Sequence, residues 1–348
     1  MNFADEVINW YSTNKRDLPW RNSNDAYVIW LSEIILQQTR VEQGLPYFNR
    51  FLEKYPDVKH FAAADESEIL KLWQGLGYYS RGRNMLKTAR MVNELFQGNF
   101  PDRYEQLIKL KGIGEYTAAA ISSFAANEAK AVVDGNVYRV LARYFGIDED
   151  INSTKGKKTF QQLANDLLNK ETPGLHNQAM MEFGAMLCKP KNPDCKACPL
   201  AEGCFARKNN MVSGLPVKIN KVKVRERFFN YFLIEDGQSV LMNKRAENDI
   251  WANMYDLPLI ETKSLLTVKD LAESAEIGNL FSGPISILKV SAVHKHILTH
   301  QRLFVRLIKV KNLPLQLEAS WFYVPVEKLT ELALPKILTV LLEDLLRQ

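Results

Sequence analysis

The chain has 348 residues, of which 46% are hydrophobic and 24% charged, so it can form two domains that each bury a core. Its net charge of +5 permits a polyanionic partner without requiring one. No apolar run reaches the roughly 18 residues that span a bilayer, and the first residues are partly acidic rather than signal-like, so we expect a cytoplasmic protein without a membrane partner. In that reducing compartment its four cysteines indicate a metal site rather than disulfides.

Helical patterns fill the chain up to about residue 210. The apolar spacing predicts one helix over residues 3–13 and a second helix over residues 25–39. Glu33 lies in an unusually apolar part of the second helix, where desolvation would raise the pKa of its carboxyl and favour a proton donor. The alternative is a helix glutamate whose carboxyl reaches solvent.

Further helical patterns cover residues 44–55 and 66–73, and a turn over residues 75–84 follows them. This turn combines glycines, the adjacent Tyr78 and Tyr79, and arginines spaced after them. Such residues suit stacking on nucleobases beside contacts to phosphate. A turn whose tyrosines pack inward is the alternative interpretation.

Gly112 and Gly114 form a hairpin between a helix that ends near Lys111 and one that begins near Tyr116. Glycines let the backbone approach a phosphate closely, and the N-terminus of the following helix presents free N–H groups. The pattern is suggestive rather than specific, because many turns between helices carry two glycines.

Asp134 comes directly before Gly135 and a helical run over residues 137–145. By itself this position is typical of a helix N-cap. A carboxylate that accepts hydrogen bonds from backbone N–H groups is expected to stay ionised.

The four cysteines, Cys188, Cys195, Cys198 and Cys204, have the spacing C-x6-C-x2-C-x5-C and are separated by prolines and lysines. Four thiolates can bind a tetrahedral zinc ion or a 4Fe–4S cluster. Zinc ribbons usually pair two short C-x2-C knuckles, whereas this pattern has one knuckle and two wider arms. We therefore favour the iron–sulfur cluster.

Beyond about residue 209 the character of the chain changes. A break at residues 213–216 precedes a basic run formed by Lys218, Lys221, Lys223, Arg225 and Arg227. This pattern predicts an interdomain linker that can lie along a phosphate backbone, with a merely solvated linker as the alternative.

Strand-like runs at residues 228–234, 239–243 and 321–325, with helical patterns at 268–275 and 334–346, predict an α+β domain. By alternation, His294, His296 and His300 would share one strand face with Leu298. Three histidines on one face suggest either a second metal site or an ordinary polar or binding surface.

The hairpin over residues 110–118, Asp134 and the cysteine spacing together resemble the helix–hairpin–helix DNA glycosylases of the endonuclease III superfamily. Further stretches narrow the resemblance to the MutY-type adenine DNA glycosylases, namely residues 18–21, 32–39, 75–79, 133–140 and 177–185. The resemblance covers essentially the whole chain, although the last third matches loosely. It implies that the enzyme flips an adenine paired with 8-oxoguanine out of the duplex and hydrolyses its N-glycosidic bond.

By this resemblance, Glu33 is the general acid that protonates the imidazole edge of adenine, and Asp134 stabilises the oxocarbenium-like sugar. Asn136 would position Asp134 or the attacking water. The residues implied in binding are Trp20, Arg21, Leu36 and Gln178 for the adenine pocket, Gln38 and Tyr78 for the base stack, Thr39 for the lesion pair, and Lys111, Gly112 and Gly114 for phosphate.

Tyr116 stands where the endonuclease III branch has a lysine nucleophile that cleaves the strand through an imine. A phenol cannot form that imine, so the resemblance implies a monofunctional glycosylase with little or no lyase activity. Because the residue at this position decides whether an imine can form, we group Tyr116 with the predicted catalytic residues.

The C-terminal part resembles the MutT-like (Nudix-fold) domain of these enzymes through residues 249–258, but the acidic Nudix box is absent. We therefore expect recognition of 8-oxoguanine rather than hydrolysis of a pyrophosphate. The family reads this base with a Phe-Ser-His loop, and this chain has Leu298, Thr299 and His300 instead. Threonine keeps the hydroxyl, but leucine cannot stack as phenylalanine does. This alignment also displaces the metal interpretation of the histidines.

The sequence thus predicts a multi-domain chain: an all-α glycosylase domain over residues 1–212 with the hairpin at about 107–120 and the iron–sulfur loop at 188–204, a basic linker over 213–226, and an α+β Nudix-like domain over 227–348. We expect a monomeric adenine DNA glycosylase of base excision repair that acts on double-stranded DNA with adenine opposite 8-oxoguanine or guanine, and that is nucleoid-associated if bacterial.

Two alternatives stay open at this point. One is an endonuclease III-like glycosylase and lyase for oxidised pyrimidines, against which Tyr116 and the C-terminal domain argue. The other is a non-catalytic, lesion-binding iron–sulfur protein, which would need neither Glu33 nor Asp134.

Overall fold

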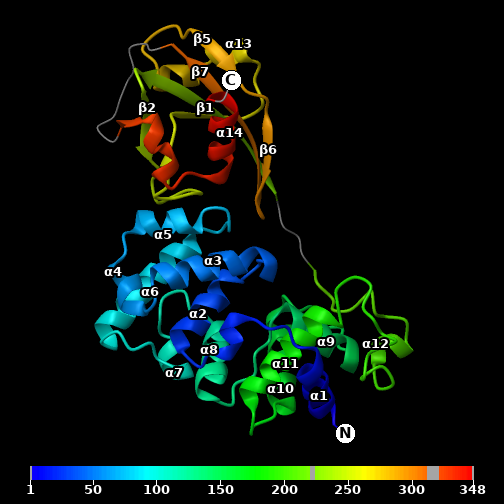
Figure 1. The fold of residues 1–348 in the computed structure, drawn as a ribbon. Coiled ribbons are helices and arrows are strands. Elements are labelled where there is room, and N and C mark those ends of the chain that lie inside the picture. Colours follow the sequence, from blue (N-terminus) through cyan, green and yellow to red (C-terminus); the bar gives the residue numbers. More distant parts are fainter. Residues whose placement is uncertain (1, 220–223, 312–320, 347–348) are drawn as a thin grey trace. The chain divides into compact units, whose positions relative to one another are not determined.

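The computed structural model describes residues 2–219, 224–311 and 321–346, and the chain divides into two compact units (Figure 1). The first unit comprises Met1–Ala63 and Asn84–Asn220, and the second comprises Ala64–Arg83 and Lys221–Gln348. The predicted fold class, a helical part and a part built on a sheet, is confirmed. Lys221 and Lys223 of the predicted basic run lie outside the described residues.

The first unit consists of helices joined by turns. Its elements are α1 (Phe3–Asn14), η1 (Pro19–Asn22), α2 (Ala26–Ile35), α3 (Val41–Lys54), α4 (Val58–Ala63), α7 (Tyr104–Leu107), α8 (Glu115–Ala126), α9 (Gly135–Phe145), α10 (Thr154–Leu167), α11 (Pro173–Met186) and α12 (Phe205–Lys208). Helix α6 (Ser80–Leu95) begins in the second unit and continues into the first.

Helix α2, which carries the predicted acid Glu33, is almost completely buried. Asp25 caps it by accepting a hydrogen bond from the Tyr27 N–H, and every residue of the helix except Val28 is buried. The helix packs against α3 and α8. It ends four residues earlier than predicted, because Gln38 adopts a left-handed backbone with φ 56° that breaks the helical path.

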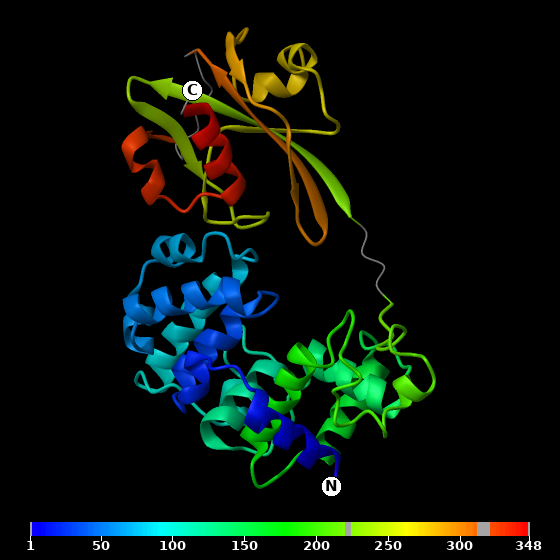
Figure 2. The ribbon, with the colours of Figure 1, turned by 45° about the vertical axis from the view of Figure 1, so that its right-hand side comes forward.

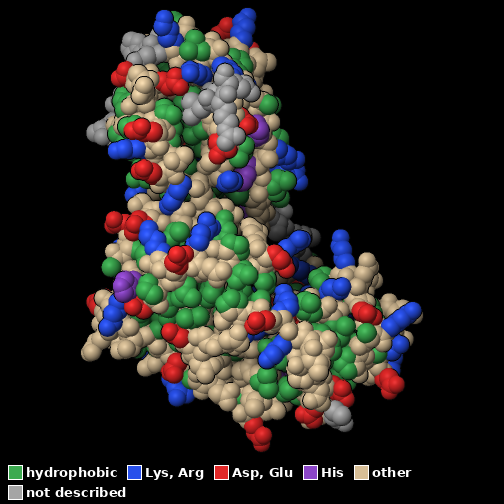
Figure 3. Space-filling view, in the orientation of Figure 1, with side chains coloured by type: hydrophobic (Ala, Val, Ile, Leu, Met, Phe, Trp, Pro, Cys, Tyr) green, Lys and Arg blue, Asp and Glu red, His purple; other side chains and the backbone are tan. Residues whose placement is uncertain are grey.

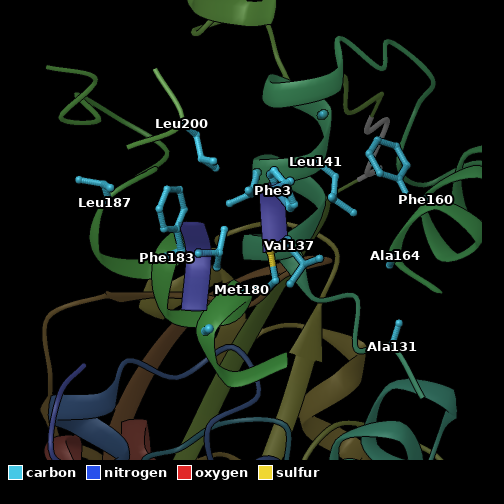
Figure 4. Close-up of a cluster of buried hydrophobic side chains, with 14 of the residues drawn as sticks. Phe3, Ala131, Val137, Leu141, Phe160, Ala164, Met180, Phe183, Leu187 and Leu200 are labelled. Atoms are coloured by element: carbon cyan, nitrogen blue, oxygen red, sulfur yellow. The ribbon is translucent and has the colours of Figure 1, made fainter. Parts of the chain in front are cut away.

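A second core lies where α1, α9, α10 and α11 meet (Figure 4). The side chains drawn there come from all four helices and from the segment after α11, and they include Phe3, Val137, Phe160 and Phe183. Burying an aromatic side chain of this size contributes roughly 1.5–3 kcal/mol. This packing fixes the positions of α9 and α11. Asp134 lies at the N-terminal end of α9, and Gln178 lies on α11.

The hairpin between α7 and α8 has the geometry that its glycines require. Gly112 has φ 80°, a left-handed conformation, and a Cβ there would lie 2.9 Å from the Cβ of Asn84. Gly114 is the N-cap of α8 and supplies no side-chain cap. The first N–H groups of α8 are therefore left for a ligand or water.

Among its described residues, the second unit contains α5 (Glu66–Trp73) and an eight-stranded sheet. Its strands are β1 (Arg225–Asp236), β2 (Ser239–Lys244), β3 (Tyr255–Asp256), β4 (Leu259–Thr262), β5 (Ile287–Val290), β6 (His294–Ile297), β7 (Gln301–Val310) and β8 (Phe322–Pro325). The order is β3-β2-β1-β7-β5, with β4 on β1, β6 on β7 and β8 on β2. The long strands β1 and β7 pair in parallel and lie side by side in Figure 2.

Helices cover this sheet. Phe232 of β1 and Ile308 of β7 share a buried cluster with Leu271 of α13 (Val268–Ala272) and Ile277 of η2 (Ala275–Asn279). Helix α14 (Lys336–Leu346) packs against β7, and η3 (Val326–Glu331) precedes it. The single helix predicted over residues 268–275 is thus divided into α13 and η2.

The prediction that three histidines share one strand face is wrong for His300. His294 and His296 face Val305 and Leu303 across the β6–β7 pair. Strand β6 ends at Ile297, because the Leu298 N–H donates to the Gln301 carbonyl, so His300 lies in the turn between the strands.

No helix among the described residues is long and apolar enough to cross a membrane. Figure 3 shows acidic and basic side chains interspersed on the visible face.

Candidate active site

A cavity of about 1080 Å³ opens in the first unit between α2, α8, α9 and α11. It gathers predicted site residues that are far apart in the sequence: Trp20, Arg21, Glu33, Leu36, Gln38, Thr39, Tyr116, Asp134, Asn136 and Gln178. The short helix η1 brings Trp20 and Arg21, while Leu36, Gln38 and Thr39 follow the last turn of α2. Their assigned roles stay predictions, but the structure places these side chains around one space.

Glu33 is buried in the wall of this cavity, with only 9% of its surface exposed. The pKa of its carboxyl is raised to about 7, chiefly by burial and also by the Asp134 carboxyl, while the Tyr116 hydrogen bond and Arg21 act to lower it. The Tyr116 hydroxyl donates to Glu33 Oε2 at 2.7 Å. Because Oε2 accepts this hydrogen bond, a proton on the neutral carboxyl is favoured on Oε1.

Tyr116 remains a neutral donor in this pair. Burial raises the pKa of its phenol well above the ordinary value, and the carboxyls of Glu33 and Asp134 raise it further. An un-ionised phenol can stabilise a carboxylate at Glu33, yet it adds no positive charge that would strip the carboxyl of its proton.

Asp134 both caps α9 and lines the cavity. Its Oδ1 accepts hydrogen bonds from the N–H groups of Asn136 at 2.9 Å and Val137 at 2.8 Å, and its Oδ2 accepts from Asn136 Nδ2 at 2.6 Å. The predicted cap is therefore present. Nevertheless, the pKa of Asp134 is raised rather than lowered, because desolvation by burial outweighs these hydrogen bonds and the more distant Arg139.

Asn136 is itself held by an arginine of α9. Arg139 Nη2 donates to Asn136 Oδ1 at 2.8 Å, and Arg139 Nε donates to the Cys188 carbonyl at 2.7 Å. Arg139 also donates to the Gly184 carbonyl at 2.7 Å. The amide that contacts Asp134 is thus tied to the backbone at the start of the cysteine loop.

Another carboxylate in the cavity wall, Glu182, has surroundings opposite to those of Glu33. Glu182 of α11 is 1% exposed and accepts paired hydrogen bonds from both Arg16 and Arg21, the shortest at 2.7 Å. Burial raises the pKa of Glu182, but the two guanidinium groups outweigh burial and lower this pKa to about 2. Glu182 therefore stays ionised and fixes the planar head of Arg21.

Gln178 lies one helical turn before Glu182, on the same face of α11. Its Oε1 accepts a hydrogen bond from the Tyr11 hydroxyl at 2.8 Å. Gln178, Arg16 and Arg21 also line a neighbouring cavity of about 580 Å³, so they stand between the two spaces.

The remaining predicted residues lie outside this cavity. Lys111, Gly112 and Gly114 are exposed on the hairpin of the first unit. In the second unit Thr299 and His300 are exposed, Leu298 is half-buried, and the exposed Tyr78 contacts the Thr299 hydroxyl through its own hydroxyl. Tyr78, with φ 47°, is exposed, whereas Tyr79 is buried, so the alternative interpretation of tyrosines that pack inward holds for Tyr79 and is wrong for Tyr78.

The four cysteines are unpaired and half-buried, and they line one cavity. Arg143 Nη1 donates to Cys188 Sγ at 3.4 Å, and the Cys204 thiol donates to the Arg143 carbonyl at 3.5 Å. Within the described residues, no group of three or more His, Cys, Asp or Glu side chains could hold a metal ion. Lys189 and Lys191 of the same loop line the larger cavity beside Asp134.

Sequence reasoning missed Tyr11, Arg16, Glu182 and Arg139. Glu182 could have been found from its spacing of four residues after Gln178, which places an acid on a helix face otherwise filled by buried side chains. The two arginines that neutralise it are more than 160 residues away, and no local pattern predicts that pairing.

Comparison with known proteins supports the architecture. A family model described as HhH-GPD superfamily base excision DNA repair protein matches residues 31–168, and a NUDIX domain model matches residues 230–344. The solved structure of a thermostable thymine-DNA glycosylase is similar, with 30% identity, a TM-score of 0.56 and coverage of 60% of this chain and 95% of that chain. The expected helical glycosylase domain followed by a Nudix-like domain is confirmed.

Relatives matched over more than half of the chain narrow the assignment. An adenine DNA glycosylase of Buchnera aphidicola subsp. Schizaphis graminum is 36% identical over 262 residues, which cover 75% of this chain and 76% of the relative. The human adenine DNA glycosylase is 42% identical over 214 residues, which cover 59% of this chain and 39% of the relative. The enzyme class expected from the sequence, a DNA N-glycosylase of base excision repair, is confirmed, and the chain belongs to the adenine DNA glycosylase family.

Proposed function

We propose that this enzyme removes adenine opposite 8-oxoguanine or guanine in duplex DNA by hydrolysis alone, with Glu33 as the acid and Asp134 as the group that stabilises the sugar cation. The observation that carries the proposal is the hydrogen bond from Tyr116 to Glu33 in a cavity that also holds Asp134. The target base must leave the stack to reach such a cavity.

Glu33 is suited to give the proton that makes adenine a leaving group. Its pKa of about 7 keeps much of the carboxyl protonated at neutral pH. The proton passes from Glu33 to a ring nitrogen of adenine, the bond between that base and its sugar breaks, and neutral adenine leaves. A general acid of this kind typically contributes a factor of about 10² to 10⁴ in rate.

Asp134 is suited to the sugar, where positive charge develops. Its oxygens are fixed by the Asn136 and Val137 N–H groups and the Asn136 amide, so a carboxylate there needs little rearrangement during the reaction. A water molecule then adds to the sugar and loses its proton, which leaves an abasic site. Burial strengthens the attraction between the Asp134 carboxylate and the sugar cation, because the surroundings screen charge weakly.

The absence of an amine at position 116 supports hydrolysis without strand cleavage. The Tyr116 phenol stays protonated and bonded to Glu33, and it has no nitrogen with which to form an imine. Lys189 and Lys191 also line the cavity, but both are exposed on the cysteine loop. Borohydride treatment of the reaction with DNA should therefore trap little covalent adduct, and strong trapping would contradict monofunctional hydrolysis.

The thiols of Cys188, Cys195, Cys198 and Cys204 fit a 4Fe–4S cluster better than a single zinc ion. They line one cavity, and their spacing has one C-x2-C knuckle with two wider arms, unlike the paired knuckles of zinc ribbons. The cluster would supply structural support to the loop that carries Lys189 and Lys191. Freshly purified protein should be yellow-brown, and a colourless protein with one bound zinc would contradict the cluster.

Two surfaces support binding to damaged duplex DNA. In the first unit, exposed Gly112 and Gly114 leave the N-terminal N–H groups of α8 open to a phosphate, with Lys111 beside them. In the second unit, the exposed turn with Thr299 and His300 offers a hydroxyl and an imidazole for reading 8-oxoguanine. We infer that the enzyme acts on this DNA as a monomer.

Single-turnover excision from duplexes with adenine opposite 8-oxoguanine, guanine, cytosine and thymine tests the proposal. We expect release of adenine opposite 8-oxoguanine and guanine, and loss of that release in Glu33→Gln and Asp134→Asn. Glu94→Gln, an exposed glutamate on α6, is the matched control and should keep the wild-type rate. Wild-type rates in both Glu33→Gln and Asp134→Asn would overturn the mechanism.

A further inference from the structure

Tyr11 lies outside the cavity that holds Glu33 and Asp134, yet it touches a residue of that cavity. It belongs to α1, which packs along α11 (Figure 1), and it is only 2% exposed. Its hydroxyl donates to Gln178 Oε1 at 2.8 Å across 167 residues of sequence. Tyr11 lines the smaller cavity, whereas Gln178 lines both.

The surroundings of Tyr11 favour a hydroxyl that donates. Lys15 Nζ lies 5.7 Å and the Arg21 guanidinium carbon 5.6 Å from the centre of its ring. Burial raises the pKa of the Tyr11 phenol, Arg21 lowers it and Glu182 raises it, so on balance the hydroxyl keeps its proton and can donate it. The partner atom on Gln178 is therefore the amide oxygen rather than the amide nitrogen.

A glutamine amide carries an acceptor at one end and two donors at the other, and it can match either kind of partner by turning over. The bond from Tyr11 removes this freedom by holding the oxygen end. The amide of Gln178 then presents its oxygen and its amino group to the large cavity in one fixed order.

We propose that Tyr11 is a positioning residue that fixes the amide of Gln178 and so makes the cavity select adenine over purines with the reversed order of hydrogen-bonding groups. Adenine has an amino group and a ring acceptor where hypoxanthine, of nearly the same shape, has a carbonyl and a ring N–H. A fixed amide matches one of these bases, whereas a free amide turns over and matches both. This inference rests on the proposed excision of adenine.

The test compares two substrates in one preparation. Single-turnover rates are measured for release of adenine and of hypoxanthine, each opposite 8-oxoguanine in otherwise identical duplexes. Tyr11→Phe keeps the ring and removes the hydroxyl, and we expect the ratio of the adenine rate to the hypoxanthine rate to fall about tenfold, which corresponds to one hydrogen bond between neutral groups. The ratio does not depend on the fraction of folded enzyme.

Two further variants separate positioning from packing. Tyr144→Phe makes the same chemical change, the loss of one phenol hydroxyl, at a tyrosine that packs against Phe3. Tyr144 lines neither cavity, so this variant should leave the ratio unchanged. In a Gln178→Ala background Tyr11→Phe should have no further effect on the ratio, because Tyr11 acts only through Gln178. If Tyr11→Phe does not fold, Gln178→Met replaces it in the test. Methionine keeps the size of the side chain but lacks the amide oxygen and amino group, so this variant should lower the ratio as well.

An unchanged ratio in Tyr11→Phe or Gln178→Met would overturn the inference. So would an equal fall in the ratio when Tyr11→Phe is made in the Gln178→Ala background, since that result indicates a general disturbance of the site. Failure of the wild-type enzyme to release adenine is a different outcome, which would contradict the proposed function itself.

Discussion

Glu33 and Glu182 line the same cavity and are both buried, but their carboxyls differ by about five pH units in pKa, from about 7 to about 2. Glu33 has a neutral phenol as its hydrogen-bond partner, whereas Glu182 has two guanidinium groups. Burial acts on both in the same direction. The difference therefore comes from the charge of the partner.

This contrast assigns the two glutamates to different tasks. A buried carboxyl beside a neutral donor keeps its proton near neutral pH and can give it away. A buried carboxylate between two arginines keeps its charge and holds the arginines in place. One glutamate is thus equipped for proton transfer, and the other for the geometry of Arg21.

The largest expected effect on stability comes from removing the charge of Glu182. Glu182→Gln leaves Arg16 and Arg21 without a charged partner in a buried site, so the free energy of unfolding should fall by about 3–5 kcal/mol. Urea unfolding of the full chain measures this change, with Glu94→Gln as the exposed control. A loss below about 1 kcal/mol would mean that the guanidinium groups find solvent, and that the pair does not fix Arg21.

Glu33→Gln should have the opposite effect on stability, and only at higher pH. Because the folded pKa of Glu33 is raised from 4.5 to about 7, its favourable protonation is complete below pH 4.5 and is lost as the pH rises through 7. The wild type should therefore be less stable than Glu33→Gln by up to about 3 kcal/mol at pH 8. Both proteins should converge below pH 4.5, and equal stability at pH 8 would argue against a raised pKa.

The rate of excision should follow the protonation of Glu33. Above pH 7 the single-turnover rate should fall about tenfold per pH unit, because only the protonated carboxyl can deliver a proton. At low pH the rate should fall as Asp134, whose pKa is also raised, becomes neutral. A rate that stays level from pH 6 to pH 9 would show that no acid with this pKa takes part.

The smallest expected effect comes from the neutral partner. The Tyr116 hydrogen bond lowers the pKa of Glu33, so its removal in Tyr116→Phe should raise this pKa further. The alkaline fall in rate should then move to higher pH by less than about one unit, since one neutral hydrogen bond contributes about 1 kcal/mol. A shift to lower pH would contradict the assignment of Tyr116 as a donor to Glu33.

The sequence predicted the Glu33 side of this contrast better than the Glu182 side. The apolar run of α2 is a local signal, and a carboxyl within it is expected to be desolvated wherever the helix packs. The Arg16, Arg21 and Glu182 contacts instead depend on how α1, η1 and α11 come together. Local periodicity contains no information about such long-range pairing.

Asp134 and His300 show two further limits of sequence reasoning. The N-cap of Asp134 was predicted correctly, but the direction of its pKa was not, because desolvation depends on the cavity around it. His300 was placed on a strand face by alternation, although the strand ends three residues before it. Strand ends are set by pairing with β7, which a period of two residues cannot reveal.

The most direct test of the contrast is a titration of glutamate carboxyls by carbon-13 NMR in the full chain, with Glu33→Gln and Glu182→Gln used to assign the two signals. The structure predicts one glutamate that titrates near pH 7 and disappears in Glu33→Gln, and one that stays ionised down to about pH 2 and disappears in Glu182→Gln. If both signals titrate near pH 4.5, the account of Glu33 as a proton donor is wrong.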